Sequence, residues 1–119
     1  MISAIINKIG DECRKFAINE IRGAALEADL APNPEWVRRI FEKSRQMDLP
    51  FLAVPESFSG GGGSLLECAK VLETLAVECA GVASVYAHHY CACAPLLMAD
   101  VAIQKHSYAK FTQQKDPQL

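Results

Sequence analysis

The sequence has little net charge, no C-x-x-C pair and no second strand-like segment, and each lack excludes a class of protein. Lys and Arg number 12 and Asp and Glu 14, which gives a net charge of -2. This balance provides no basic surface, so we expect no nucleic-acid partner. The five cysteines are odd in number and contain no C-x-x-C pair. That usage favours reduced thiols in a cytoplasmic protein over a secreted disulfide framework.

Charged residues are absent from a long internal stretch. Residues 79–99 contain no Asp, Glu, Lys or Arg, and about 20 apolar residues suffice to cross a bilayer. The stretch is nevertheless rich in small residues, has His88 and His89 at its centre and contains Pro95. A helix that is apolar on every side is also typical of the buried helix in a bundle. We therefore expect a buried helix over residues 82–94 and no membrane span.

Helical spacing of apolar residues indicates further helices before this stretch. Asp11 is a candidate N-cap for a first helix that runs to about Asp29. The apolar residues 2–9 are too short for a signal peptide and are expected to open that helix. Asn33 and Pro34 are the residue types preferred where a helix starts. The expected apolar stripe of this second helix consists of Trp36, Val37, Ile40, Phe41, Ser44 and Met47.

Proline and glycine organise the segment that follows. Residues 51–54 are too few for a helix and are expected to form a buried extended connector. Residues 60–63, all glycine, predict a flexible turn, whose amides we expect Glu56 to bind, and they lack the ending of a phosphate-binding loop. Ser64 and Glu67 have the spacing of a capping box. The helix behind it carries an apolar stripe that we expect to face the core: Leu65, Ala69, Leu72, Ala76 and Cys79.

These patterns together predict one domain over residues 1–119 with an all-α fold. We expect an up-and-down bundle of four to five helices around a buried central helix, with the last helix over about residues 101–114. Apolar residues make up 50% of the chain before any Gly is counted, more than a lone small domain needs. We therefore expect a homo-oligomer, a dimer or a higher species, that covers exposed apolar surface.

The residues 88–93 include the types that bind zinc. On one helix, His88 pairs with Cys91 and His89 with Cys93, and at about 100° per residue the two pairs point in different directions. We therefore expect no metal site. Ser84 and Ser107 lie near histidines in sequence, but no buried carboxylate completes a relay. The sequence thus assigns no catalytic residue.

One motif spans the glycine turn and the start of the next helix. It is formed by Val54, Pro55, Glu56, Phe58, Gly60, Gly62, Ser64, Leu65, Leu66 and Glu67. Further on come Gly81-Val82-Ala83-Ser84, then His89, then Pro95-Leu96-Leu97. The order and spacing of these residues, from about Phe16 to Phe111, resemble the N-terminal domain of the acyl-CoA dehydrogenase family. Ser59 departs from the family pattern, which usually has Gly directly after the aromatic residue.

The resemblance implies a role in the oxidation of acyl-CoA thioesters. Enzymes of this family combine an N-terminal helical domain, a central β domain and a C-terminal helical bundle. They remove a proton α to the thioester carbonyl while a hydride passes from the β-carbon to FAD. The catalytic Glu and most flavin contacts belong to the two later domains, which would lie beyond Leu119. We therefore expect neither a catalytic base in this chain nor FAD bound to this chain alone.

In the family, the N-terminal domain supplies one wall of the acyl pocket and a subunit-facing surface. The resemblance places the lining helix at residues 82–94. The substrate-binding residues that we assign on it are Ala83, Ser84, Ala87, His88 and Cys91. Such small side chains would leave room for a bulky or branched acyl chain. A non-catalytic helical interaction module, or the N-terminal domain of a flavin monooxygenase or acyl-CoA oxidase, stays open as an alternative. The expected location is the cytoplasm, or the mitochondrial matrix in a eukaryote.

Overall fold

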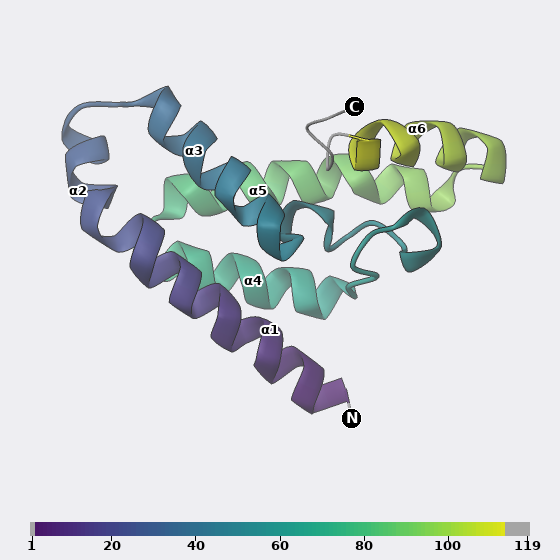
Figure 1. The fold of residues 1–119 in the computed structure, drawn as a ribbon, viewed down its shortest axis with the longest axis horizontal. Coiled ribbons are helices and arrows are strands. Elements are labelled where there is room, and N and C mark those ends of the chain that lie inside the picture. Colours follow the sequence, from purple (N-terminus) through teal and green to yellow (C-terminus); the bar gives the residue numbers. More distant parts are fainter. Residues whose placement is uncertain (1, 114–119) are drawn as a thin grey trace.

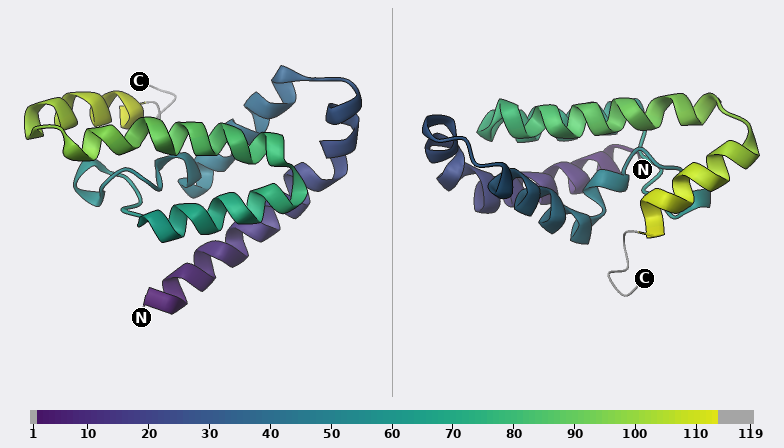
Figure 2. Two further views of the ribbon diagram at one scale, coloured as in Figure 1. Left: turned by 180° about the vertical axis from the view of Figure 1, so that it is seen from behind. Right: turned by 90° about the horizontal axis from the view of Figure 1, so that it is seen from above.

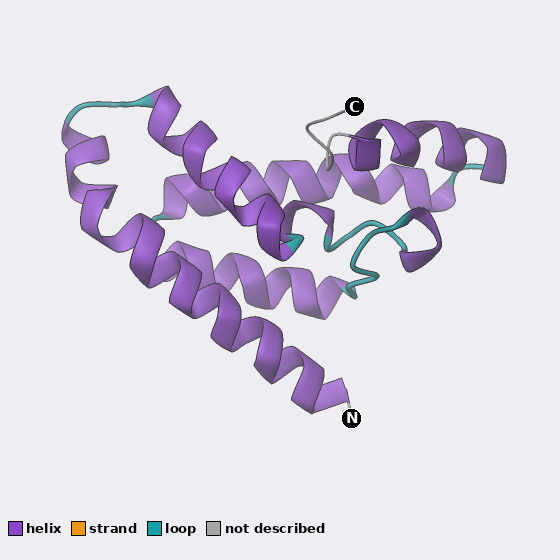
Figure 3. Cartoon of the chain, in the orientation of Figure 1, coloured by secondary structure: helices purple, strands orange, loops and turns teal. Residues whose placement is uncertain are grey.

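The computed structural model describes residues 2–113, and every regular element in that range is helical (Figures 1 and 3). The main helices are α1 (Ile2–Ala17), α2 (Gly23–Leu30), α3 (Pro34–Ser44), α4 (Leu65–Glu78), α5 (Ala80–Cys93) and α6 (Val101–Gln113). A π-helical turn, η1 (Ile18–Arg22), joins α1 to α2. Short 3-10 turns are η2 (Arg45–Met47), η3 (Leu49–Phe51), η4 (Glu56–Phe58) and η5 (Ala94–Met98). The all-α bundle predicted from the sequence is confirmed.

The helices run up and down around α4 and α5. The rod formed by α1, η1 and α2 crosses α4 obliquely and contacts it through α1 and η1, and α4 lies along α5 through a tight connection at Cys79 (Figures 1 and 2). Helix α3 returns from the far end of the rod toward the glycine turn. Helix α6 folds back after η5 and packs against η4 and η5. Among residues 2–113, no helix is both long and apolar enough to cross a membrane.

One large cluster of buried side chains holds these helices together. Its members come from the rod, α3, η3 and the turn after it, α4 and α5: Cys13, Ala17, Ile21, Ile40, Leu49, Leu52, Cys68, Val71, Leu75, Val82, Ala83, Tyr86 and Tyr90. A second, smaller cluster, formed by Val54, Cys93 and Tyr108, lies under α6. The stripe predicted for the second helix is confirmed, since its residues are buried or half-buried in α3 and the turn after it. Helix α6 is thus anchored separately from the main core.

The first helix differs from the prediction at its start. Helix α1 begins at Ile2 and passes through Asp11 without a break, so the N-cap assigned to Asp11 is wrong. Asp11 is instead an exposed residue in mid-helix. The predicted opening of the helix by residues 2–9 is confirmed. The π-helical turn at 18–22 was not foreseen, because nothing in the apolar spacing distinguishes a widened turn from an α-helical one.

Two helix starts follow the capping chemistry predicted from the sequence. The Asn33 side chain accepts hydrogen bonds from the amides of Glu35 and Trp36 at 3.1 and 3.3 Å. The Ser64 hydroxyl accepts from the Glu67 amide at 3.2 Å, and the Glu67 carboxylate accepts from the Ser64 amide at 2.6 Å. Each cap satisfies amides that the helix itself leaves unpaired and contributes about 1 kcal/mol. The positions of α3 and α4 along the chain are therefore set locally.

The tetraglycine segment is pinned rather than flexible. The amides of residues 60–63 donate to the carbonyl oxygens of Pro55, Phe51, Val54 and Leu52, respectively, at 3.1, 2.9, 2.8 and 2.6 Å. Of the four, only Gly62 has a positive φ, at 62°. The other glycines are needed for close approach, since a Cβ at Gly60 would overlap the Val54 carbonyl. With every amide taken, Glu56 cannot bind them as predicted, and it lies exposed beside Gly62.

The connector before the glycines is buried but not extended. Phe51, Leu52 and Val54 are nearly inaccessible to solvent, as predicted, yet they form the end of η3 and a following turn. The prediction of an extended connector was therefore wrong. The compact form brings the carbonyls of this segment within reach of the glycine amides, which an extended strand without a partner strand would leave unpaired.

The buried face of α4 overlaps the predicted one only in part. Its buried residues are Cys68, Val71 and Leu75, which pack toward α1 and α5. Leu65 is 88% exposed, and Ala69 and Ala76 are exposed as well. Leu72 and Cys79, the other two members of the predicted stripe, are half-buried and pack against the main cluster, so the prediction is right for them and wrong for the other three. Helix α4 is apolar on two sides, and apolar spacing alone does not say which side the neighbouring helices cover. A large apolar surface of α4 therefore faces solvent.

Candidate functional site

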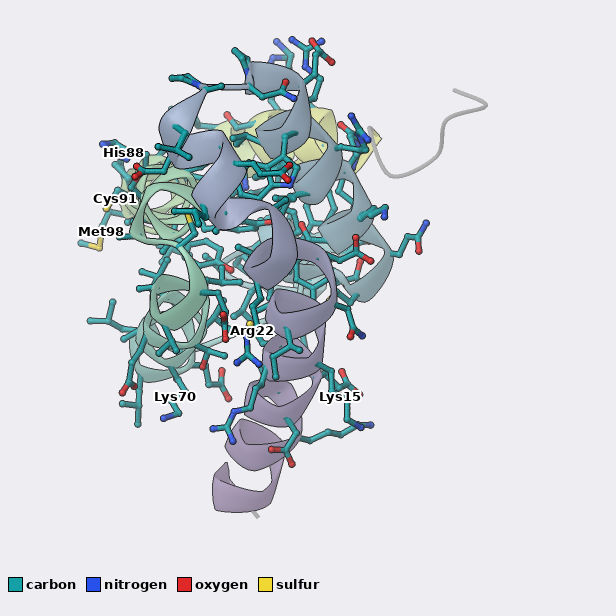
Figure 4. All side chains as sticks on the ribbon, turned by 90° about the vertical axis from the view of Figure 1, so that its left-hand side faces the viewer. Lys15, Arg22, Lys70, His88, Cys91 and Met98 are labelled. Atoms are coloured by element: carbon teal, nitrogen blue, oxygen red, sulfur yellow. The ribbon has the colours of Figure 1, made fainter. Side chains whose placement is uncertain are left out.

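Helix α5 has one buried and one open face. The buried face consists of Val82, Ala83, Tyr86, Tyr90 and Cys93. The open face consists of Ala80, Gly81, Ser84, Val85, His88, Cys91 and Ala92. The prediction of a buried central helix is therefore right for one side of α5 only. Figure 4 shows His88, Cys91 and Met98 on the same outer side of the molecule. This uncharged outer face of α5 is the candidate site.

Three polar side chains fix the rotation of α5 about its axis. The Tyr86 hydroxyl donates to the hydroxyl of buried Ser44 at 2.6 Å, and the Tyr90 hydroxyl donates to the Leu49 carbonyl at 2.8 Å. His89 Nε2 lies 2.7 Å from the Pro50 carbonyl oxygen, which can only accept, so Nε2 carries the proton. These bonds tie α5 to α3 and η3. They turn the opposite side of the helix, which carries Ser84 and His88, outward.

The buried core on the inner side of α5 predicts a loss of stability in alkali. Burial raises the pKa of the Cys13 thiol from 9.0 to about 11 and that of Tyr86 from 10.0 to about 12. Both groups therefore keep their protons in the folded chain at pH values where the unfolded chain has lost them. The stability from these groups is fully present below about pH 9 and falls as the pH rises to about 12. Urea unfolding at pH 8 and at pH 11 should give a clearly lower free energy at pH 11.

Tyr86→Phe provides the control for this pH dependence. The variant should lose about 1 kcal/mol at pH 8, because the Ser44 hydroxyl loses its donor but keeps its own bond to the Phe41 carbonyl at 2.7 Å. It should also lose less stability than the parent between pH 10 and pH 12. If the parent and the variant lose the same free energy of unfolding over that interval, ionisation of Tyr86 does not contribute to the loss of stability in alkali.

The five residues assigned to substrate binding divide between the two faces. Ser84, His88 and Cys91 are exposed and lie on the outer face, Ala87 is half-buried at its edge, and Ala83 is 6% exposed and faces the core. Main-chain carbonyls orient the two polar groups. The Ser84 hydroxyl donates to Gly81 O at 2.7 Å, and His88 Nδ1 lies 2.6 Å from Ser84 O. The structure thus brings four of the five together along one side.

The two histidines point to different partners. His88 contacts the carbonyl of its own helix on the outside, whereas His89 contacts Pro50 and lies edge-on to the Phe41 ring at 5.4 Å. Within residues 2–113, no group of three or more His, Cys, Asp or Glu side chains is placed to hold a metal ion. The chemistry available on the outer face is therefore that of packing and of single hydrogen bonds.

Sequence reasoning missed the apolar side chains that extend the outer face past the end of α5. Met98, in η5, is 90% exposed, and Leu97 beside it is also exposed. The signal that could have found them is the uncharged stretch 79–99, which continues beyond Pro95. That stretch was interpreted as buried on all sides, so its later part was not considered as surface. The outer face is therefore longer than the assigned residues.

The family model described as acyl-CoA dehydrogenase, N-terminal domain, matches residues 6–111. The chain belongs to the acyl-CoA dehydrogenase family. The recognition made from the turn and helix motifs is thereby confirmed. Comparisons with curated proteins and with solved structures gave no match.

The departure of this acyl-CoA dehydrogenase domain from its family motif has a structural consequence at Ser59. Ser59 follows the aromatic Phe58 and has a φ of 65°, in the left-handed region that favours glycine. The backbone of Ser59 therefore has a conformation that glycine adopts without steric cost, at the position where the family usually has Gly. Its amide donates to the Glu56 carbonyl at 3.0 Å, which closes η4 before the tetraglycine segment.

Proposed function

We propose that this chain is the N-terminal portion of a flavin-dependent acyl-CoA dehydrogenase, which catalyses α,β-dehydrogenation of acyl-CoA thioesters. In this proposal the outer face of α5 forms one wall of the acyl pocket. The apolar surface around it packs against the domains that complete the enzyme. Family membership supports the reaction class, and the exposure of an uncharged, small-residue face on α5 supports its place in the pocket.

The observation that carries the proposal is the chemistry of this outer face. Ser84, Ala87 and Cys91 are small, and no residue from 79 to 99 is charged. The transfer of an alkyl chain from water to such a surface is favourable by roughly 25 cal/mol for each Å² of apolar surface that is buried. A solvated helix face would instead carry charged residues. Ala83, which points into the core, would contribute to this wall only by setting the distance between α5 and the helices behind it.

The flavin and the catalytic base are assigned to the rest of the enzyme. In the described range, the glycine amides that could hold a pyrophosphate are all bonded to main-chain carbonyls, so this loop does not fit FAD. FAD, when bound in the complete enzyme, would accept the hydride from the substrate β-carbon. The residues of this chain would bind and orient the acyl chain and exclude water from it.

Ala87→Leu in the complete enzyme tests the pocket wall. The larger side chain at the edge of the outer face should lower kcat/KM for long acyl chains at least about tenfold relative to short ones, since one methylene in a fitted pocket is worth about 10-fold or more. Ala69→Leu is the matched control, because Ala69 is also exposed on a helix but lies on α4, outside the outer face of α5. Equal losses across all chain lengths for Ala87→Leu would contradict the proposed wall.

The alternative functions differ in whether the complete protein consumes O₂ and in whether it turns over substrate at all. A flavin monooxygenase or acyl-CoA oxidase with this domain would consume O₂ in step with substrate, whereas a dehydrogenase needs a separate electron acceptor. A non-catalytic interaction module would show no turnover and no yellow colour in the complete protein. We place the dehydrogenase first because the matching family model is that of acyl-CoA dehydrogenases.

We further propose that, when the chain is studied alone, exposed apolar side chains of one copy pack against those of another copy. Large apolar residues that stand in solvent include Leu65, Leu66, Val85, Leu97 and Met98. Extended apolar surface of this kind marks interfaces in soluble proteins. A second copy of the chain is the partner available in dilute solution. Self-association is therefore the expected behaviour.

A further inference from the structure

A separate groove lies between the rod and α4, away from the outer face of α5. The rod crosses α4 obliquely (Figure 1), and the hollow between them has a volume of about 260 Å³. The π-helical turn η1 forms part of its wall, contributing Ile18 and Arg22. Such widened turns are frequent at functional sites. The groove is therefore a candidate ligand site that is separate from the outer face of α5.

Charge in this groove is not balanced. Arg22 is held by Glu78 through two hydrogen bonds, Nε to Oε2 at 3.0 Å and Nη2 to Oε1 at 2.7 Å. The bonds from Arg22 lower the pKa of Glu78, so this pair is ionised at neutral pH. Lys70 has only a longer contact, 3.3 Å, to the well-exposed Glu73. Arg14 forms no ion pair with any residue in the described range, which leaves one positive charge unneutralised.

The sides of the groove between these charges are apolar. Ile18 is 38% exposed and Val77 is 77% exposed, and buried Ala17 lies at the base. Exposed apolar atoms next to an unneutralised cation suit a ligand that has an alkyl chain and one negative charge. The volume is just below the 300–1,000 Å³ usual for drug-sized ligands, which excludes a whole CoA thioester.

We propose that the groove between η1 and α4 binds a short alkyl carboxylate, with its chain along Ile18 and Val77 and its carboxylate at Arg14 and Lys70. Figure 4 shows Arg22 between α1 and α4 and Lys15 on the opposite side of α1. The Arg22–Glu78 pair closes one end of the groove and holds the two helices at a fixed spacing. This site goes beyond the proposed acyl-pocket wall and does not depend on it.

Titration of the labelled chain with octanoate, followed by ¹H–¹⁵N NMR, tests this site. Amide shifts should concentrate at Ile18, Thr74 and Val77 and give a Kd in the millimolar range, as expected for so small a ligand. Acetate removes the chain and octylamine inverts the charge, so both should bind at least about threefold more weakly. Added salt should weaken octanoate binding, because the carboxylate contact is solvent-exposed.

Two charge variants decide whether the groove is responsible. Arg14→Gln should weaken octanoate binding about three- to fivefold, the effect of one exposed ion pair. Lys15→Gln removes a cation of the same helix that faces away, and should leave the Kd unchanged. Equal effects of the two variants, equal binding of octylamine, or shifts confined to Ser84 and His88 on α5 would each overturn the proposal. The last result would still be compatible with the acyl-pocket wall.

Discussion

Gly60→Ala should destabilise the folded chain by about 3 kcal/mol, the upper part of the range for overpacked positions. A Cβ at this position would overlap both the carbonyl oxygen and the side chain of Val54, which is itself completely buried. The main chain would have to move, and the bonds from the neighbouring glycine amides to Phe51 and Leu52 would lengthen. Urea unfolding measured by circular dichroism should show the loss as a lower midpoint.

Gly23→Ala is the matched control, and its effect should have the opposite sign. Gly23 lies in the helical rod at a φ of -69°, and a Cβ there would meet nothing within 4 Å. The variant should gain about 0.5–1 kcal/mol, because Ala loses less backbone entropy than Gly in a helix. A stable Gly60→Ala protein would show that the glycine segment is not held against Val54.

Leu75→Ala should cost about 2–5 kcal/mol, the range for truncating a fully buried leucine. Leu75 is completely inaccessible to solvent in the main cluster, where α4 meets α1 and α5. The cavity left behind would be lined by rigid helices and would collapse only in part. The measurement is the free energy of unfolding in urea. A cost below about 1 kcal/mol would mean that α4 buries a different face.

Leu65→Ala removes the same atoms from the same helix and should change stability by less than about 0.5 kcal/mol. Leu65 belongs to the stripe that the sequence indicated as the core side of α4, and it is 88% exposed. The pair of variants thus measures the rotation of α4 directly. If Leu65→Ala were the costlier of the two, the rotation described here would be wrong.

Local chemistry made the helix ends of this fold predictable, whereas long-range contacts decided the rest. The caps at Asn33 and Ser64 involve residues two or three positions away, so the sequence contains the whole motif. The glycine segment was misjudged because conformational freedom was equated with flexibility. What fixes it is the close approach of the Leu52–Val54 backbone, and no local pattern reports that approach.

The sequence located the helix that carries the candidate site, but it did not show which face of that helix is exposed. Spacing from Gly81 to Pro95 located the helix correctly in the sequence. Its rotation depends on Tyr86 and Tyr90, which bond to residues 42 and 41 positions earlier in the chain. Those partners could not be paired from apolar periodicity, because α5 is apolar on both sides. For the same reason Ala83 was assigned to the pocket although it faces the core.

Sedimentation equilibrium of the chain across micromolar concentrations is the most direct test of the idea that α5 and η5 present an interface. We expect a dimer or a higher species, and we expect Met98→Glu, which places a charge at the most exposed of these residues, to shift the distribution toward monomer. A compact monomer at every concentration, with no effect of Met98→Glu, would contradict the account.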